Sequence, residues 1–336
     1  KGKGLLAVDE STPTIGKRLK SINIENTEAN RQAYRGMLFD TQGLGDYISG
    51  AILFEETLYQ DHPDGESMVA KLNKLGIIPG IKVDKGLRPL LGANPVETWV
   101  QGLEGLVERT AEYYQRGARF AKWRAVLQIT DDGAPTNQAI KENAWGLARY
   151  ARACQESGLV PIVEPEILMD GSHSIERTAQ IQENILNEVY KACAENGVYL
   201  EGTLLKPSMT VAGADCPEQA TAEQVAQMTI QTLDRCVPAA VPGITFLSGG
   251  LTEEDASVFL NTMNSIPRKG SWNVSFSYGR ALQQSCLQAW QGKNIEAGQK
   301  ALMARAQANS EASTGSYVAG SQPSAQESLF EAGYKY

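Results

Sequence analysis

Histidine is almost absent from this sequence, and its scarcity limits the metal chemistry that the chain can support. Only His62 and His173 occur among the 336 residues, both in turn-like sequence and far apart along the chain. A zinc site built on several histidines is therefore excluded, and the absence of any CxxC pair removes the usual thiolate alternative. We expect no metal centre.

Paired cysteines are also lacking. The count is odd, and none of the five is spaced like a member of a disulfide framework: Cys154, Cys193, Cys216, Cys236 and Cys286. A chain of this size can build a core without disulfides, so free thiols and a reducing compartment are predicted. Cys216 lies in a polar stretch that we expect to be exposed, and its sensitivity to mild oxidants is a hypothesis; the favoured alternative is that all five cysteines are inert.

Long apolar runs and an excess of basic residues are missing as well. No stretch approaches the ~18 apolar residues of a membrane helix, and 31 Lys and Arg against 39 Asp and Glu give a net charge of −8. We therefore expect no membrane partner and no nucleic-acid partner, although a local basic pocket for an anion remains compatible with this charge. Residue 1 is Lys rather than Met, so a further N-terminal segment is expected in the whole protein.

What the sequence does contain is a regular alternation of strand-like and helix-like segments. In 174–196, for example, apolar residues recur at a spacing of four, which marks one face of a helix. Gly117, Gly158 and Gly197 each follow a helical stretch, as a left-handed helix stop does. Runs rich in Val, Ile, Leu and Phe predict strands at 5–9, 50–54, 79–83, 119–123, 161–165, 202–206, 244–248 and 274–277.

Eight strands that alternate with helices predict the α/β class and a single (β/α)8 TIM barrel. The alternative is an open doubly wound sheet, which usually places G-x-G-x-x-G after its first strand. Here "ESTPTIGKR" (10–18) follows that strand and lacks the motif. We expect the barrel to span residues 1–309 and the Ser-, Ala- and Gly-rich segment 310–336 to be a mobile C-terminal tail.

Polar side chains close most of the predicted strands. In a (β/α)8 barrel these C-terminal ends meet at one rim, which carries the catalytic groups. Positions 122, 164, 206 and 248 are separated by equal steps of 42 residues, so we expect their side chains at equivalent heights on successive strands. The residues at the strand ends are Asp9, Lys82, Lys122, Glu164, Lys206, Ser248 and Ser277.

Three lysines and several carboxylates on one rim predict a catalytic site rather than a set of independent structural residues. A single lysine at a strand end usually extends to solvent, but burying several charges together is costly unless they have a task. Neighbouring cations favour the neutral amine form of a lysine. Lys206 is therefore the candidate nucleophile that attacks a ketone, and the protonated imine it forms can support C–C cleavage without a metal.

Two loops at the same rim predict a phosphate site. "SGG" (248–250) and "SYGRA" (277–281) end the last two strands, each precedes a helix, and Arg280 can bind an anion in a bidentate manner. The segment "DESTPTIGKR" (9–18), with Lys82 nearby, suggests a second anion site. The alternative for Ser11 or Thr14 is that either one only caps a helix.

The sequence resembles a known family at these residues. "LLAVDES", "GIKVDKG", "FAKWR", "VPIVEPEIL", "EGTLLKPSM", "FLSGG", "FSYGRAL" and a terminal Tyr are similar, in the same order across nearly the whole chain, to the motifs of class I fructose-1,6-bisphosphate aldolases. "YISGAILFEETLYQ" (47–60) and "GARFAKWR" (117–124) resemble the plastid type of plants and algae. "SMTVAGADCPEQ" (208–219) departs from the usual pattern.

The resemblance implies a role for each matching residue. Lys206 matches the Schiff-base lysine, Glu164 the acid/base of carbinolamine dehydration, and Asp9 the acceptor of the C4 hydroxyl proton. Lys122 matches the lysine that positions these intermediates, Glu166 joins the catalytic set, and Tyr336 matches the mobile tyrosine of proton exchange at C3. One phosphate pocket is implied at Ser248, Gly249, Gly250, Ser277, Gly279 and Arg280, and contacts to the other phosphate at Ser11, Thr14, Arg18, Lys82 and Arg124.

The implied activity is reversible cleavage of fructose 1,6-bisphosphate to dihydroxyacetone phosphate and glyceraldehyde 3-phosphate, with the imine on Lys206 in place of a cofactor. A homotetramer in the chloroplast stroma that serves glycolysis, gluconeogenesis and the Calvin–Benson cycle is expected, with the cytoplasm as the alternative location. A transaldolase is the alternative enzyme, but its substrate carries one phosphate. A non-catalytic binding scaffold is the other alternative, but it would be expected to lose a chemical residue, and none is lost. Preference between fructose and sedoheptulose bisphosphates stays open.

Overall fold

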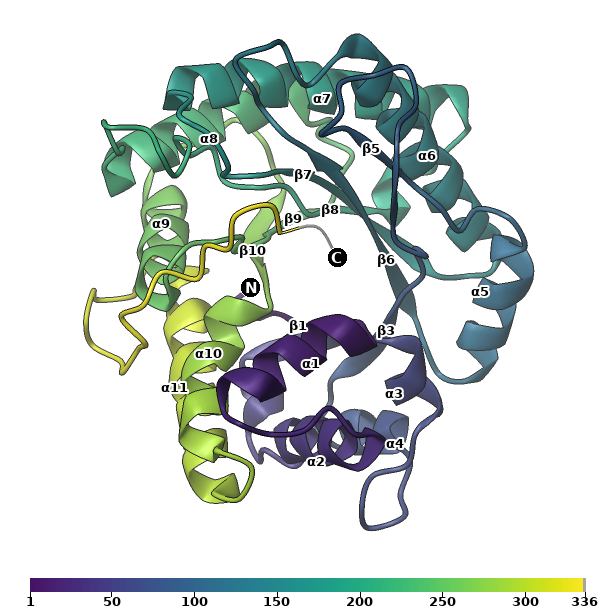
Figure 1. Ribbon diagram of the computed structural model, residues 1–336, viewed down its shortest axis with the longest axis vertical. Helices are drawn as coiled ribbons and strands as arrows, with labels where there is room; N and C mark the ends of the chain where they lie inside the picture. Colours follow the sequence, from purple (N-terminus) through teal and green to yellow (C-terminus); the bar gives the residue numbers. More distant parts are fainter. Residues whose placement is uncertain (335–336) are drawn as a thin grey trace.

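Eight parallel strands form a closed barrel in the computed structural model, which describes residues 1–334. Figure 1 shows these strands in the centre, with helices around them. The order around the barrel is β1-β10-β9-β8-β7-β6-β3-β2. The strands are β1 (Gly4–Val8), β2 (Ile48–Leu53), β3 (Ile78–Lys82), β6 (Phe120–Leu127), β7 (Val160–Ile167), β8 (Leu204–Leu205), β9 (Gly243–Phe246) and β10 (Asn273–Tyr278).

Helices connect successive strands on the outside of the barrel, as the (β/α)8 arrangement requires. The short antiparallel pair β4 (Leu87–Pro89) and β5 (Thr98–Val100) lies outside the barrel sheet. The helices are α1 (Thr12–Ser21), α2 (Glu28–Phe39), η1 (Leu44–Asp46), α3 (Glu55–Tyr59), α4 (Met68–Lys74), α5 (Leu106–Gln115), α6 (Asn137–Glu156), α7 (Ile175–Glu195), η2 (Leu200–Gly202), α8 (Ala222–Cys236), α9 (Glu253–Ser265), α10 (Arg280–Trp290) and α11 (Ile295–Ala312). Within residues 1–334, none of them has the length and apolar character needed to span a bilayer.

The predicted barrel is confirmed, and each of the eight predicted runs overlaps a barrel strand. The three glycines that were expected to stop helices have φ values of 107° at Gly117, 79° at Gly158 and 64° at Gly197, so they adopt the left-handed conformation. The hairpin β4–β5 was not predicted, because its strands are only three residues long and largely exposed. Helix α11 continues to Ala312, past the expected boundary at residue 309.

The phenyl ring of Phe120 fills much of the barrel interior toward the N-terminal ends of the strands, which we call the bottom of the barrel. Phe120 of β6 belongs to a small apolar cluster that contains strand residues only, namely Leu5, Ala7, Ile52, Phe120 and Ile162, with Leu204 against it. Gly50 on β2 and Gly80 on β3 make room for this ring, because a Cβ on Gly80 would lie 2.2 Å from it and a Cβ on Gly50 2.9 Å from it. The larger apolar cluster joins the outer faces of the strands to the helices.

The close approach of Phe120 to Gly80 gives a test of this packing. We expect Gly80→Ala to lower the free energy of unfolding by about 1–3 kcal/mol, the usual cost of an overpacked core. Gly146→Ala is the matched control, because a Cβ at that position in α6 meets nothing within 4 Å. The control should stabilise by about 0.5–1 kcal/mol, since alanine favours helix over glycine. Urea unfolding of both variants measures the difference, and equal effects would contradict the packing role of Gly80.

Candidate active site

Every second residue of a barrel strand points inward, and these inward residues change from apolar to charged toward the C-terminal ends of the strands. On β6, Lys122 and Arg124 follow Phe120 on the same face. On β7, Glu164 and Glu166 follow Ile162 in the same way. All four charged side chains are buried. The strands therefore carry an apolar layer first and two charged layers above it.

The tilt of the strands decides which of these side chains meet. Lys122 is paired in register with Ile162, and Glu164 is paired with Arg124, so equal steps along the chain do not give register partners. Strands in a barrel are tilted and staggered, however, and residues at one height are offset in register. The expectation of similar heights is confirmed for this pair, since Lys122 Nζ lies 3.6 Å from Glu164 Oε2.

Glu164 lies between two lysines. Its Oε1 is 3.3 Å from Nζ of Lys206, which follows β8 directly, and its Oε2 faces Lys122. Lys206 is 4% exposed, Glu164 3% and Lys122 1%. Electrostatic attraction between such groups is strong because water is largely excluded from around them. The candidate nucleophile and the candidate acid/base are therefore held in direct contact.

Two aspartates complete this buried network. Asp9, directly after β1, places Oδ2 2.8 Å from Lys122 Nζ. Asp84 places Oδ1 2.7 Å from Lys82 Nζ and Oδ2 3.9 Å from Lys122 Nζ. Burial alone would raise the pKa of each carboxyl group. The ammonium groups outweigh burial and lower the pKa of both, those of Lys122 and Lys206 mainly at Asp9 and those of Lys82 and Lys122 at Asp84. Both aspartates are therefore carboxylates at neutral pH.

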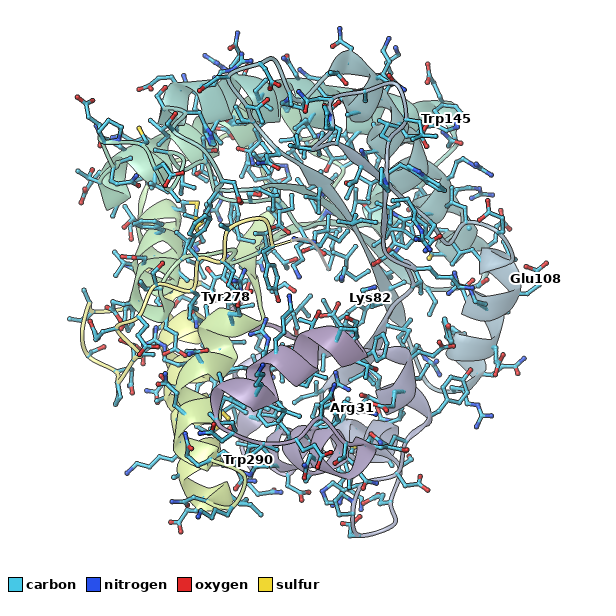
Figure 2. The ribbon with its side chains drawn as sticks, in the orientation of Figure 1. Arg31, Lys82, Glu108, Trp145, Tyr278 and Trp290 are labelled. Carbon is cyan, nitrogen blue, oxygen red and sulfur yellow. The ribbon has the colours of Figure 1, made fainter. Side chains whose placement is uncertain are left out.

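Asp84 was not among the residues predicted from the sequence. It stands two positions after Lys82 in "GIKVDKG", so the same alternation that places Lys122 and Arg124 on one face could have identified it. Figure 2 labels Lys82, on β3, and Tyr278, on β10, to the right and left of the barrel centre. The ammonium group of Lys82 also donates to the backbone carbonyl of Asp84, at 3.0 Å.

The predicted phosphate residues border a cavity above this network. The cavity has a volume of about 510 Å³. Gly279 is the N-cap of α10, and no side chain caps this helix, which begins at Arg280. Gly250 lines the adjoining cavity, of about 450 Å³. The lining of the first cavity includes Asp9, Lys122, Glu164 and Lys206 together with Ser248, Gly249, Ser277, Gly279 and Arg280.

The residues predicted for the second anion site are only partly brought together. Arg18 and Arg124 line the cavity, and Arg124 Nε donates to Glu166 Oε2 at 2.5 Å. Thr14 lines a neighbouring hollow that also contains Arg18 and Arg280. Ser11 is not in these linings but lies 3.0 Å from Thr14 through the two hydroxyl oxygens, and its side chain does not cap α1. Lys82 is directed to Asp84 instead of the cavity.

The C-terminal segment reaches this cavity and places Tyr334 among three arginines. Arg18 Nη2 donates to the Tyr334 hydroxyl at 3.0 Å, and Arg124 Nη2 donates to its carbonyl at 3.3 Å. The Arg280 guanidinium lies 4.2 Å from the centre of the Tyr334 ring. Nothing in the sequence pattern indicates this contact. Tyr336 lies outside the described residues.

Histidine and cysteine take no part in the site. Among residues 1–334 there is no group of three or more His, Cys, Asp or Glu side chains arranged to hold a metal ion. All five cysteines are free thiols, and Cys216 is the one that is partly exposed, as expected. Burial raises the pKa of the Cys193 and Cys286 thiols to about 12, so neither is a reactive thiolate at neutral pH.

Comparison with known proteins agrees with this geometry. The family model "Fructose-bisphosphate aldolase class-I" (glycolytic) matches residues 1–336. The chain is 57% identical over 338 residues to "Fructose-bisphosphate aldolase 3, chloroplastic" of Arabidopsis thaliana, covering 100% of this chain and 85% of the relative. It is 56% identical over 339 residues to "Fructose-bisphosphate aldolase 4, cytosolic" of the same plant, covering 100% and 86%.

A solved structure shows the same fold. The fructose-bisphosphate aldolase of Plasmodium falciparum, in a complex with TRAP and a small-molecule inhibitor, superposes with a TM-score of 0.93 at 55% sequence identity. The match covers 95% of this chain and 92% of that one. The family model matches the whole chain, and the relatives are more than half identical to it over its full length. The chain therefore belongs to the class I fructose-bisphosphate aldolase family.

Proposed function

We propose that this protein cleaves fructose 1,6-bisphosphate reversibly to dihydroxyacetone phosphate and glyceraldehyde 3-phosphate, through an imine on Lys206. The observation that carries the proposal is the contact of Lys206 Nζ with Glu164 Oε1 at 3.3 Å, inside a buried network of lysines and carboxylates. A nucleophilic amine needs a nearby group that moves protons, and Glu164 is that group.

The first half of the reaction uses Lys206 and Glu164. Glu164 first takes a proton from the Lys206 ammonium group, 3.3 Å away, and the neutral amine then attacks C2 of the open-chain ketose. A proton passes from the nitrogen to the C2 oxygen and gives the carbinolamine. Glu164 then returns its proton to the C2 hydroxyl, which leaves as water, and the nitrogen lone pair forms the protonated imine. Because Glu164 also faces Lys122 at 3.6 Å, the lysine can stabilise the carboxylate that remains after the transfer.

The second half uses Asp9 and Lys122. Asp9 accepts the proton of the C4 hydroxyl, the C3–C4 bond breaks, and its electron pair moves into the imine to give an enamine and glyceraldehyde 3-phosphate. The lowered pKa of Asp9 keeps it ionised for this step, and Lys122 at 2.8 Å orients it. Protonation at C3 and hydrolysis of the imine release dihydroxyacetone phosphate. The imine is the electron sink, so no cofactor enters the scheme.

Basic side chains on different elements support binding of two phosphates. Arg280 stands with Ser248, Gly249, Ser277 and Gly279 after the last two strands, whereas Arg18 comes from α1 and Arg124 from β6. We assign the first group to the C1 phosphate and the second to the phosphate at the other end of the sugar. Two such groups favour a bisphosphate substrate over the monophosphate of a transaldolase. Glu166 contributes by holding Arg124.

The remaining expectations follow from the family. Relatives of similar identity are chloroplastic and cytosolic, and we favour the chloroplast stroma, with a role in the Calvin–Benson cycle beside glycolysis and gluconeogenesis, and keep the cytoplasm as the alternative. A homotetramer is expected from the family resemblance. Proton exchange at C3 by Tyr336 stays a prediction.

A trapping experiment tests the imine. Borohydride reduction in the presence of dihydroxyacetone phosphate should inactivate the enzyme and add the triose phosphate to Lys206, because only an imine is reduced to a stable amine. Peptide mass spectrometry locates the adduct, and EDTA should leave activity unchanged. An adduct on Lys122, or inhibition by EDTA, would contradict the mechanism.

Replacement of Glu164 separates proton transfer from binding. We expect Glu164→Gln to lower kcat by about 10²–10⁴-fold, the usual contribution of general acid–base catalysis, and to change KM far less. A carboxamide keeps the size of the side chain but cannot transfer the proton. Steady-state kinetics measures both constants, and a variant that changed KM alone would indicate a structural role.

Replacement of Arg280 tests the assignment of the C1 phosphate. Arg280→Ala should weaken the binding of fructose 1-phosphate by about 1.5–3 kcal/mol, or about 10- to 150-fold, the usual worth of a hydrogen bond to a charged group. Arg152→Ala is the matched control, because Arg152 pairs with Glu156 on the exposed face of α6. Calorimetric titration compares the two variants, and unchanged affinity in Arg280→Ala would place the phosphate elsewhere.

A further inference from the structure

A single buried carboxylate outside the cavity joins three parts of the chain. Glu253 is the first residue of α9 and is 0% exposed. Its Oε1 accepts the backbone N–H of Ser285 in α10 at 2.9 Å, and its Oε2 accepts the backbone N–H of Ala325 at 2.7 Å. The Ser285 hydroxyl donates to the same Oε2. The carboxylate therefore accepts hydrogen bonds from both α10 and the C-terminal segment.

The two helices joined by Glu253 carry the two halves of the candidate phosphate pocket. Helix α9 begins three residues after Gly250, at the end of the loop that contains Ser248 and Gly249. Helix α10 begins at Arg280. The carboxylate thus fixes the start of α9 relative to α10, and with it the Gly-rich loop relative to the arginine.

The same region ties down the first part of the C-terminal segment. Arg305 of α11 is 0% exposed and donates through Nη2 to the Glu253 carbonyl at 2.8 Å and through Nη1 to the Pro323 carbonyl at 3.3 Å. Glu254 accepts the Tyr317 hydroxyl and the Gly320 N–H, each at 2.8 Å. Residues 317–325 are therefore bound to α9 and α11.

The contacts change character after Ala325. The Leu329 carbonyl accepts from Arg280, and Gly333 donates to Asp170, which lines the adjoining cavity. Tyr334 contacts Arg18, Arg124 and Arg280. Figure 1 shows this segment, in yellow, running past the labels of α9 and β10 toward the middle of the barrel. Residues 326–334 are thus held mainly by groups of the candidate site.

We propose that Glu253 is a positioning residue that anchors the C-terminal segment at Ala325 and sets the phosphate loops relative to each other. Glu253 thereby separates residues 317–325, which are held by α9 and α11, from residues 326–334, which are held mainly by groups of the candidate site. The anchoring part stands on the contacts alone. The part that concerns phosphate rests on the proposed function of Ser248–Gly250 and Arg280.

The chemistry of the carboxylate explains why glutamine cannot replace it. Glu253 accepts from two backbone N–H groups and one hydroxyl group, and both of its oxygens are needed. A glutamine would present an NH₂ group to one of these donors and would leave it unsatisfied in a buried place. Such a loss costs more than an exposed hydrogen bond, because no water takes over.

Hydrogen exchange on the unmodified enzyme tests the anchor. Amides of residues 317–325 should exchange at least ~10-fold more slowly than those of 326–334, because a buried carboxylate and Arg305 hold the first part. Inorganic phosphate should change the exchange of 326–334 and leave 317–325 unaffected, since it competes for the cavity arginines Arg18, Arg124 and Arg280 and not for the buried Arg305. Equal rates in the two parts would overturn the proposal.

A pair of proline variants tests the bond at Ala325. Ala325→Pro removes the N–H that Glu253 accepts and should speed the exchange of 317–323 by about 10-fold or more. Ser324→Pro is the matched control, because within residues 1–334 no hydrogen bond from the Ser324 N–H is found. The amides of 317–323 in this variant should exchange at the rate of the unmodified enzyme. Identical behaviour of the two variants would show that Glu253 does not hold the segment.

Inhibition by inorganic phosphate tests the second part. Glu253→Gln should raise the competitive inhibition constant of phosphate by about 3- to 10-fold, the effect of one lost positioning hydrogen bond, whereas Ala325→Pro should change it less than ~2-fold. Ser285→Ala removes one donor to Glu253 and should raise the inhibition constant to a smaller extent. This second variant decides the test if Glu253→Gln does not fold. Unchanged inhibition in both Glu253→Gln and Ser285→Ala would refute the role in positioning. Phosphate that fails to inhibit the unmodified enzyme would instead refute the proposed phosphate site, and the exchange experiments would still decide the anchor.

Discussion

The carboxylate of Glu164 between two buried lysines is the interaction on which the rest of the site depends. Lys206 and Lys122 lie 3.3 and 3.6 Å from its two oxygens. Two ammonium groups so close together would repel each other strongly in a place that excludes water. A shared carboxylate removes much of that repulsion and at the same time stands where a proton must be given and taken. The same carboxylate of Glu164 therefore balances the charge of the interior and serves as the candidate acid/base.

This arrangement requires a barrel that is apolar below and charged above. The ring of Phe120 fills the lower interior because Gly50 and Gly80 leave room for it. The next inward positions on β6 and β7 can then carry Lys122 and Glu164, which are almost fully buried and lie 3.6 Å apart as an ion pair. A side chain larger than glycine at residue 80 would collide with the ring, because its Cβ would lie 2.2 Å from it. The glycines of β2 and β3 are therefore part of the packing beneath the charged layer.

The alternation of strand residues explains how much of this the sequence could predict. Lys122, Glu164 and Lys206 were identifiable because a charged residue at an apolar strand end is unusual and because the strands converge at their C-terminal ends. Asp84 obeys the same alternation and was within reach of it. The contacts of Tyr334 and Glu253 were not, because they join residues tens to hundreds of positions apart through hydrogen bonds that leave no periodic pattern. Such partners depend on where the chain runs after the helices are packed.

Tyr334 contacts the three arginines of the candidate phosphate sites through neutral groups. Toward Arg18, Arg124 and Arg280 it presents a hydroxyl, a carbonyl and a ring face rather than a carboxylate. The bonds from these guanidinium groups to Tyr334 have one charged partner, whereas a bond to phosphate has two partners of opposite charge. A phosphate that reaches these arginines would therefore compete with the described contacts of Tyr334. An acidic residue at position 334 would form ion pairs with the arginines and would compete with phosphate more strongly than the phenol does.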